Sequence, residues 1–276
     1  MSLLDNMQLV SNAPIAPMAI TILGDAGTAK TSLLALFPKT LIIRTEDGTK
    51  SLNNKESVMQ TPVLNSSAEV LQWLSDIYNS QDSKIQTIGF DSVTKLNAII
   101  EDEVVANDQR NPKSINTACG GFGAGHNAVA KVHRSIKAWC DLLSSEKGIH
   151  IVFIAHSKIE NLDSPDMDAY SRYGLKMNKQ SLGVYVDDMD MVCQLRLNTV
   201  VLTGKGELDK AKAKSTGGIN ILAHAQASNV TKNRYDIKKE IPFIEGVFPF
   251  QSIIDTGRYI ENYNVDQSTG EIKGGA

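Results

Sequence analysis

Short runs of apolar, β-branched residues alternate with segments of helical periodicity over the first half of the chain. The apolar runs cover residues 18–23, 40–45, 85–90 and 149–155, and their nearly continuous hydrophobicity is typical of strands buried on both faces. Apolar residues recur at spacings of three and four in the intervening segments, 30–37, 67–78, 93–106 and 129–145. This alternation predicts an α/β fold with a mostly parallel, twisted sheet flanked by helices.

The pattern changes after residue 189. Strand-like runs at 189–197, 200–203 and 219–225 follow one another without helices between them, which predicts an antiparallel C-terminal extension of the sheet. We expect residues 1–17, which contain Pro14 and Pro17, to form an extended N-terminal segment. Residues 18–263 are expected to form one domain, and residues 264–276 a flexible C-terminal tail.

Composition and charge narrow the possible functions. The 276 residues are 42% hydrophobic and 21% charged, as in an ordinary globular protein. With 28 Lys and Arg against 31 Asp and Glu, the net charge of -3 excludes a polycation that wraps nucleic acid, so any DNA contact must come from local loops. Three widely spaced cysteines, no signal-like N-terminus and no apolar stretch approaching eighteen residues predict a cytoplasmic protein without a membrane partner.

A glycine-containing segment joins the first predicted strand to the first predicted helix, where a phosphate-binding loop of the Walker A type belongs. Its residues are Gly24, Asp25, Ala26, Gly27, Thr28, Ala29, Lys30, Thr31 and Ser32. Lys30 would reach the β- and γ-phosphates of a nucleotide, and Thr31 would ligate Mg²⁺. Ala29 departs from the usual pattern, which has glycine before the lysine. The alternative is a strand-to-helix turn that binds nothing.

Polar residues also follow the other three predicted strands. Glu46 is placed to orient or deprotonate an attacking water if its strand lies close to the first one. Asp91, followed by Ser92, has the Walker B pattern and is a second candidate Mg²⁺ ligand. His156 could sense a γ-phosphate and pass its presence to the following loop. Alternatively, Asp91 caps the next helix and His156 is an ordinary loop residue.

The order of these motifs resembles the core of RecA-type ATPases, and most closely the small phage-encoded ATP-binding proteins related to RecA. The resemblance spans about residues 18–250 and is carried by TLIIRTEDGTKSL, IGFDSVTKL and IVFIAHSKIE. It implies ATP and Mg²⁺ as cofactors, Glu46 as the catalytic base, and His156 as the residue that couples ATP to a DNA-binding loop. RecA itself has glutamine at that last position, whereas the phage proteins often have histidine.

Residues 230–235, VTKNRY, are similar to the lysine-rich segment through which one RecA subunit reaches the ATP of its neighbour. The resemblance implies that Lys232 and Arg234 act in trans on the transition state, as an arginine finger does. It therefore also implies a homo-oligomer, either a ring or a filament. A solvated basic turn is the alternative reading of this segment.

Two long segments, 107–128 and 158–188, lack clear periodicity and correspond in order to the two DNA-binding loops of RecA. Their basic and aromatic residues are candidate contacts to phosphates and bases. These candidates are Arg110, Lys113, Phe122, Arg172, Tyr173, Lys176 and Lys179. Acidic residues at the start of the second segment would repel phosphate, which argues against DNA there.

The resemblance implies a Mg²⁺-dependent ATPase that acts on single-stranded DNA in phage recombination or strand annealing. A single-stranded DNA-binding protein is a further candidate partner, and the host bacterium's cytoplasm is the expected location of a phage-encoded protein. One alternative is a nucleotide-dependent switch that docks a protein partner and binds little or no DNA. A small-molecule kinase is another, since it shares the phosphate loop, although Glu46 suits activation of water better.

Overall fold

The computed structural model describes residues 14–48, 52, 58–81, 84–165, 167–202, 212–265 and 272–273. Residues 14–17 have no regular secondary structure, and the rest of the expected N-terminal segment lies outside the described residues. Most of the expected C-terminal tail lies outside them too. Within that tail, β11 (Asn264–Val265) pairs antiparallel with β12 (Ile272–Lys273).

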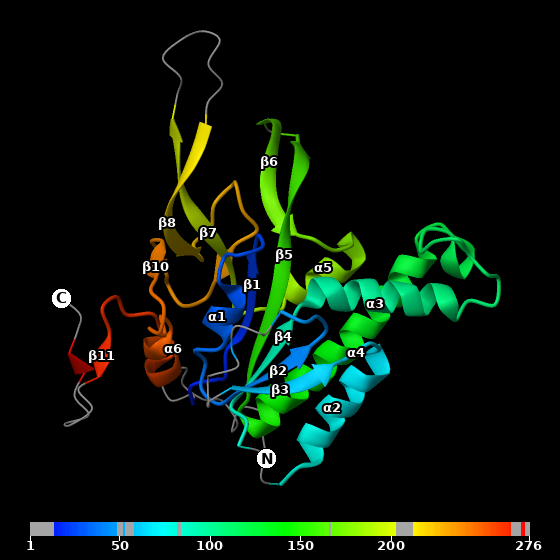
Figure 1. The fold of residues 1–276 in the computed structure, drawn as a ribbon, viewed down its shortest axis with the longest axis horizontal. Helices are drawn as coiled ribbons and strands as arrows, with labels where there is room; N and C mark the ends of the chain where they lie inside the picture. Colours follow the sequence, from blue (N-terminus) through cyan, green and yellow to red (C-terminus); the bar gives the residue numbers. More distant parts are fainter. Residues whose placement is uncertain are drawn as a thin grey trace, which may run out of the picture.

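A ten-stranded sheet, counted over the described residues, runs through the molecule in the order β10-β8-β7-β1-β5-β4-β2-β3, with β6 on β5 and β9 on β7 (Figure 1). The strands from β7 to β3 are parallel, and β6, β8, β9 and β10 pair antiparallel. The predicted sheet is thus confirmed. Its strands are β1 (Ala19–Gly24), β2 (Thr40–Arg44), β3 (Val58–Val63), β4 (Thr87–Asp91), β5 (His150–Ser164), β6 (Met167–Leu175), β7 (Met191–Leu202), β8 (Lys212–Leu222), β9 (Lys232–Asn233) and β10 (Ile241–Phe243).

Helices cover both faces of the sheet. One apolar cluster packs α2, α3, α4 and α5 on one face, and a second packs α1 and α6 on the other. β1, β2, β5 and β7 each contribute residues to both clusters, which explains the nearly continuous hydrophobicity of these strands. The helices are α1 (Lys30–Leu34), α2 (Ser67–Asn79), α3 (Val93–Ala106), the 3₁₀ helix η4 (Ala118–Gly120), α4 (Ala124–Lys147), α5 (Lys179–Val186) and α6 (Gln251–Thr256).

The sequence-based prediction for residues 158–188 is wrong. β5 continues beyond the sheet and forms a hairpin with β6, the β5–β6 hairpin (residues 157–175), which is followed by α5. The hairpin projects away from the body of the molecule (Figure 1). Because it stands clear of the core, polar residues and exposed apolar ones such as Ile159, 65% exposed, follow one another without the alternation that marks a half-buried strand.

Residues 107–123 contain η4 and otherwise no helix or strand, as the sequence indicates, and we call them the glycine-rich loop. α4 begins at Ala124, five residues before the predicted start. Its first turn, Ala-Gly-His-Asn-Ala, offers no large apolar side chains that would mark a helix. The runs predicted at 189–197 and 200–203 form one strand, β7, and the pairing register with β8 shifts between Leu197 and Thr199.

Candidate nucleotide-binding site

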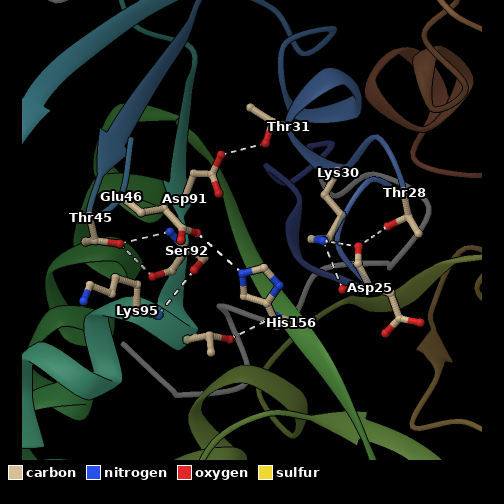
Figure 2. Close-up of polar contacts among 12 residues, drawn as sticks. Asp25, Thr28, Lys30, Thr31, Thr45, Glu46, Asp91, Ser92, Lys95 and His156 are labelled. Atoms are coloured by element: carbon tan, nitrogen blue, oxygen red, sulfur yellow. Dashed lines mark hydrogen bonds and ion pairs between the residues drawn. The ribbon is translucent and has the colours of Figure 1, made fainter. Parts of the chain in front are cut away.

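The phosphate loop connects β1 to α1, and Lys30 is folded back into it. The Lys30 ammonium donates hydrogen bonds to the main-chain oxygens of Gly24, at 3.0 Å, and Asp25, at 2.7 Å (Figure 2). Only 7% of this residue is exposed. Burial lowers the pKa of the Lys30 ammonium, and the nearby Asp91 carboxylate acts in the opposite direction. A cation is therefore held inside the loop, where a polyphosphate could replace the two carbonyl oxygens.

The backbone of the loop requires a glycine at its first position. A Cβ on Gly24 would lie 2.7 Å from the main-chain oxygen of Leu195 on β7 and 2.6 Å from Thr28 Oγ1. Ala29 has a φ of 59°, the left-handed conformation that glycine adopts without cost. The departure from the usual motif thus retains the backbone shape, at a cost of roughly 1 kcal/mol.

Thr31 and Asp91 meet at the start of α1, where the Thr31 hydroxyl donates a hydrogen bond of 2.7 Å to Asp91 Oδ2. Burial raises the pKa of the Asp91 carboxyl. Asp91 does not cap α3, because Ser92 is the N-cap and its Oγ accepts from the Lys95 N–H. A hydroxyl and a carboxylate side by side are hard oxygen donors, so these residues fit Mg²⁺.

Glu46 reaches the site although β4 and β5 separate its strand from β1. Its Oε1 lies 3.6 Å from Nε2 of His156, and both side chains are about one-third exposed (34%) (Figure 2). The His156 contact lowers the pKa of the Glu46 carboxyl, so Glu46 is ionised at neutral pH. The neighbouring Asp47 instead pairs with Arg44 at 2.7 Å. Glu46 is therefore the carboxylate available to activate a water.

Two further threonines and a serine fix the site residues, and the sequence-based reasoning did not identify them. Thr45 Oγ1 donates to the Ser92 carbonyl at 2.8 Å and holds the ends of β2 and β4 together. The Thr94 hydroxyl accepts from the His156 N–H at 2.9 Å. The Ser157 hydroxyl donates to the Asp25 carboxylate, which ties the phosphate loop to the base of the β5–β6 hairpin. In the sequence, the only sign that Ser157 belongs to the site is its position next to His156.

Lys232 and Arg234 lie away from this chain's own phosphate loop. β9 pairs with the first residues of β7, and these pair with Ile20 and Thr21, near the beginning of β1. Arg234 forms an ion pair of 3.0 Å with Asp190. The Lys232 ammonium donates to the Asp187 carbonyl at 2.6 Å. Both cations are thus at the opposite end of β1 from Gly24, so they take no part in this chain's own phosphate loop.

The candidate DNA-contacting residues on the β5–β6 hairpin and α5 differ in availability. Arg172 pairs with Glu160 on the facing strand at 2.7 Å, so its charge is already neutralised. Tyr173 is half-buried, and its main-chain N–H donates to the Ser228 carbonyl. Lys176 and Lys179 are exposed. The two lysines are therefore the better candidates here for phosphate contacts.

In the glycine-rich loop, Arg110 and Lys113 are exposed, and the Phe122 ring projects fully into solvent. Five consecutive residues, Cys119 to Gly123, have positive φ values, which for Cys119 and Phe122 is a costly conformation. A loop of this kind presents an aromatic ring that has no partner inside the described part of the chain.

Taken together, these contacts define a P-loop nucleotide-binding site at the carboxyl edge of a parallel sheet. A family model described as an AAA domain matches residues 16–235, and the chain belongs to this family of AAA-type P-loop ATPase domains. The search of curated proteins found no match. None of the helices in the described part of the chain is long and apolar enough to span a membrane.

Proposed function

We propose that the protein is a Mg²⁺-dependent ATPase of the RecA type that binds single-stranded DNA and serves phage recombination or strand annealing. The observation that carries this proposal is the meeting of Lys30, the Thr31–Asp91 pair and the Glu46–His156 pair at the sheet edge from which the β5–β6 hairpin projects. Cation, metal ligands and base are the groups that ATP hydrolysis requires.

In this proposal, Lys30 exchanges its two carbonyl partners for oxygens of the β- and γ-phosphates. Thr31 and Asp91 hold Mg²⁺, which when bound neutralises charge that develops on the phosphates. Glu46 accepts a proton from the attacking water, as its lowered pKa and its exposure permit. His156 keeps Glu46 oriented through their 3.6 Å contact, and binding of a γ-phosphate would change this contact in the proposal.

One main-chain hydrogen bond next to the nucleotide site supports coupling between ATP and DNA. The His156 carbonyl accepts from the Lys176 N–H at 2.8 Å, and Lys176 stands just after the β5–β6 hairpin. A displacement of His156 by nucleotide would therefore move an exposed lysine directly. In the proposed complex, Lys176 and Lys179 contact phosphates, while Phe122 stacks on bases.

The nucleotide-dependent switch that docks a protein partner is the second candidate function. The Arg172–Glu160 pair favours it, because this pair removes one of few positive charges from the hairpin. The fully exposed Phe122 suits an apolar pocket of a protein as well as a base.

Titration with single-stranded DNA at several salt concentrations, with and without ATP, tests the DNA-binding function. We expect ATP-dependent binding whose log-affinity falls with log salt, and a slope reduced by about 2 when Arg172, Lys176 and Lys179 all become alanine. The matched control replaces the exposed Lys84, Lys131 and Arg134 by alanine and should retain the wild-type slope. A flat slope, or equal slopes in both triple variants, would favour the switch.

A further inference from the structure

His126, at the start of α4, bridges two segments that the chain keeps 62 positions apart, from Asn116 to Asn178. Its Nε2 lies 2.9 Å from Oδ1 of Asn116 in the glycine-rich loop. Its Nδ1 lies 2.8 Å from Nδ2 of Asn178, the N-cap of α5 directly after the β5–β6 hairpin. One imidazole ring therefore contacts both the glycine-rich loop and the start of α5, the two segments that contain the candidate DNA-binding residues.

The cap at α5 determines which ring nitrogen carries the proton. The Asn178 Oδ1 accepts from the Gln180 N–H at 3.2 Å, so its amide NH₂ group faces His126. Nδ1 of His126 must then accept, and Nε2 must donate to Asn116 Oδ1. A neutral ring in this single tautomer satisfies both partners at once, and few other side chains have an acceptor and a donor at this separation.

Each segment is ordered internally up to the bridge. In the glycine-rich loop, the Asp108 carboxylate accepts from the N–H groups of Arg110 and Cys119, at 3.0 Å and 2.5 Å. Beside α5, the Lys158 ammonium donates to the Met177 carbonyl at 3.0 Å. The His126 bridge thus connects two segments, each of which is stabilised by its own hydrogen bonds.

We propose that His126 is a positioning residue that fixes the glycine-rich loop relative to α5, so that Phe122 and the lysines 176 and 179 form one binding surface. The ligand class is a single-stranded polynucleotide, and this part of the inference rests on the function proposed above. An aromatic ring for stacking and cations for phosphate must be held at a fixed separation to engage one strand together. His126 itself has no role in contacting the polynucleotide.

Hydrogen exchange of the free protein tests the bridge without any ligand. The informative variant is Asn178→Ser, because serine also caps helices but cannot reach His126 with a donor. We expect amides of residues 107–123 to exchange about tenfold faster in Asn178→Ser and in His126→Ala, and at the wild-type rate in the control Asn127→Ala. Unchanged exchange of the loop in Asn178→Ser, with α5 still protected, would overturn the proposal. If His126→Ala does not fold, Asn178→Ser and Asn116→Ala decide the question.

A second measurement separates positioning from direct contact. With single-stranded DNA, His126→Ala should lower the affinity about tenfold and leave the salt slope unchanged, since no phosphate contact is removed. A reduced slope would mean that His126 touches phosphate, which contradicts the proposal. If the wild-type protein binds no DNA, the function proposed above fails, while the exchange experiment still decides whether His126 joins the two segments.

Discussion

The carboxyl edge of the sheet and the segments that project beyond it are built on different principles. At the edge, side chains from separate elements contact one another, as Thr31 on α1 does with Asp91 on β4, and Glu46 after β2 with His156 on β5. In the projecting segments, Lys176 and Lys179 are exposed and Arg172 is paired within its own hairpin. The chemistry of the edge can therefore be inferred from contacts within the chain. The function of the projecting segments depends on the ligand that they bind.

β5 runs through both regions, and its burial changes where the sheet ends and the hairpin begins. Residues 151–155 are buried in the sheet, whereas Ile159 on the hairpin is 65% exposed. His156 and Ser157 stand at the boundary, and both contact residues of the nucleotide site. A strand that is buried at one end and, among the described strands, paired only with β6 at the other can transmit a small change at the nucleotide to the hairpin.

The largest effect should come from Lys30→Ala, which removes the only cation held inside the phosphate loop of the described chain. We expect ATP affinity to fall by about 100-fold and hydrolysis to be lost, because charge-assisted hydrogen bonds to phosphate disappear. Calorimetric titration with ATP measures the change in affinity. The control Lys131→Ala, on the exposed face of α4, should bind ATP like the wild type. A normal ATP affinity of Lys30→Ala would show that the nucleotide does not bind at this edge of the sheet.

Glu46→Gln should separate binding from turnover. The amide keeps the shape of the side chain but cannot accept a proton from water, so ATP should bind normally while the rate falls by about 10² to 10⁴. The matched control is Asp47→Asn, because Asp47 is half exposed and paired with Arg44. Wild-type turnover in Glu46→Gln, together with a loss of turnover in Asp47→Asn, would mean that Asp47 and not Glu46 is the catalytic base.

Mixing two inactive variants tests whether the site is completed by a neighbour. An Arg234→Ala subunit keeps its own phosphate loop, and a Lys30→Ala subunit can still donate Lys232 and Arg234. Partial ATPase activity should therefore return on mixing, and wild-type activity should rise faster than linearly with protein concentration, since a finger contributes several orders of magnitude in rate. Variants that co-assemble without any recovery would show that Arg234 is a surface residue only.

Acidification should weaken the core that carries both regions. Buried His133 contacts the Tyr185 hydroxyl at 2.7 Å and Asn97 Oδ1 at 3.1 Å. Burial lowers its pKa from 6.5 to about 4, so between these values the unfolded chain binds the proton and the folded chain does not. The free energy of unfolding should therefore fall as pH drops through this window, by about 3 kcal/mol. Urea denaturation at pH 7, 5 and 4 measures it. A His133→Gln variant with the same loss would contradict the assignment.

The sequence indicated which residues lie at this edge because Glu46, Asp91 and His156 each directly follow an apolar run. Lys30 could be identified from the phosphate-loop motif, and parallel strands bring their carboxyl ends to one edge whatever their order. The order itself was not predictable, so the position of Glu46 near the phosphate loop, with β4 and β5 between β2 and β1, could only be a conditional expectation. Its contact with His156 across the one intervening strand, β4, was not predicted.

The projections were less predictable for a physical reason. Among the described residues from Ser157 to Tyr173 none is buried, so this part of the hairpin carries no alternation of apolar and polar residues that would mark a strand. β3, with Pro62 inside and Met59 exposed, is an edge strand without an apolar run. The bridge through His126 depends on the tautomer that the α5 cap imposes, and no local pattern in the sequence contains this information.

Steady-state ATP hydrolysis by the wild-type protein, with saturating Mg²⁺ and ATP, measured with and without single-stranded DNA, tests most directly whether the two regions act together. We expect measurable hydrolysis that rises when DNA is added, because DNA bound at Lys176 and Phe122 would act back on His156 through the Lys176–His156 hydrogen bond. Hydrolysis that is the same with and without DNA, under conditions where DNA binding is demonstrated, would contradict it.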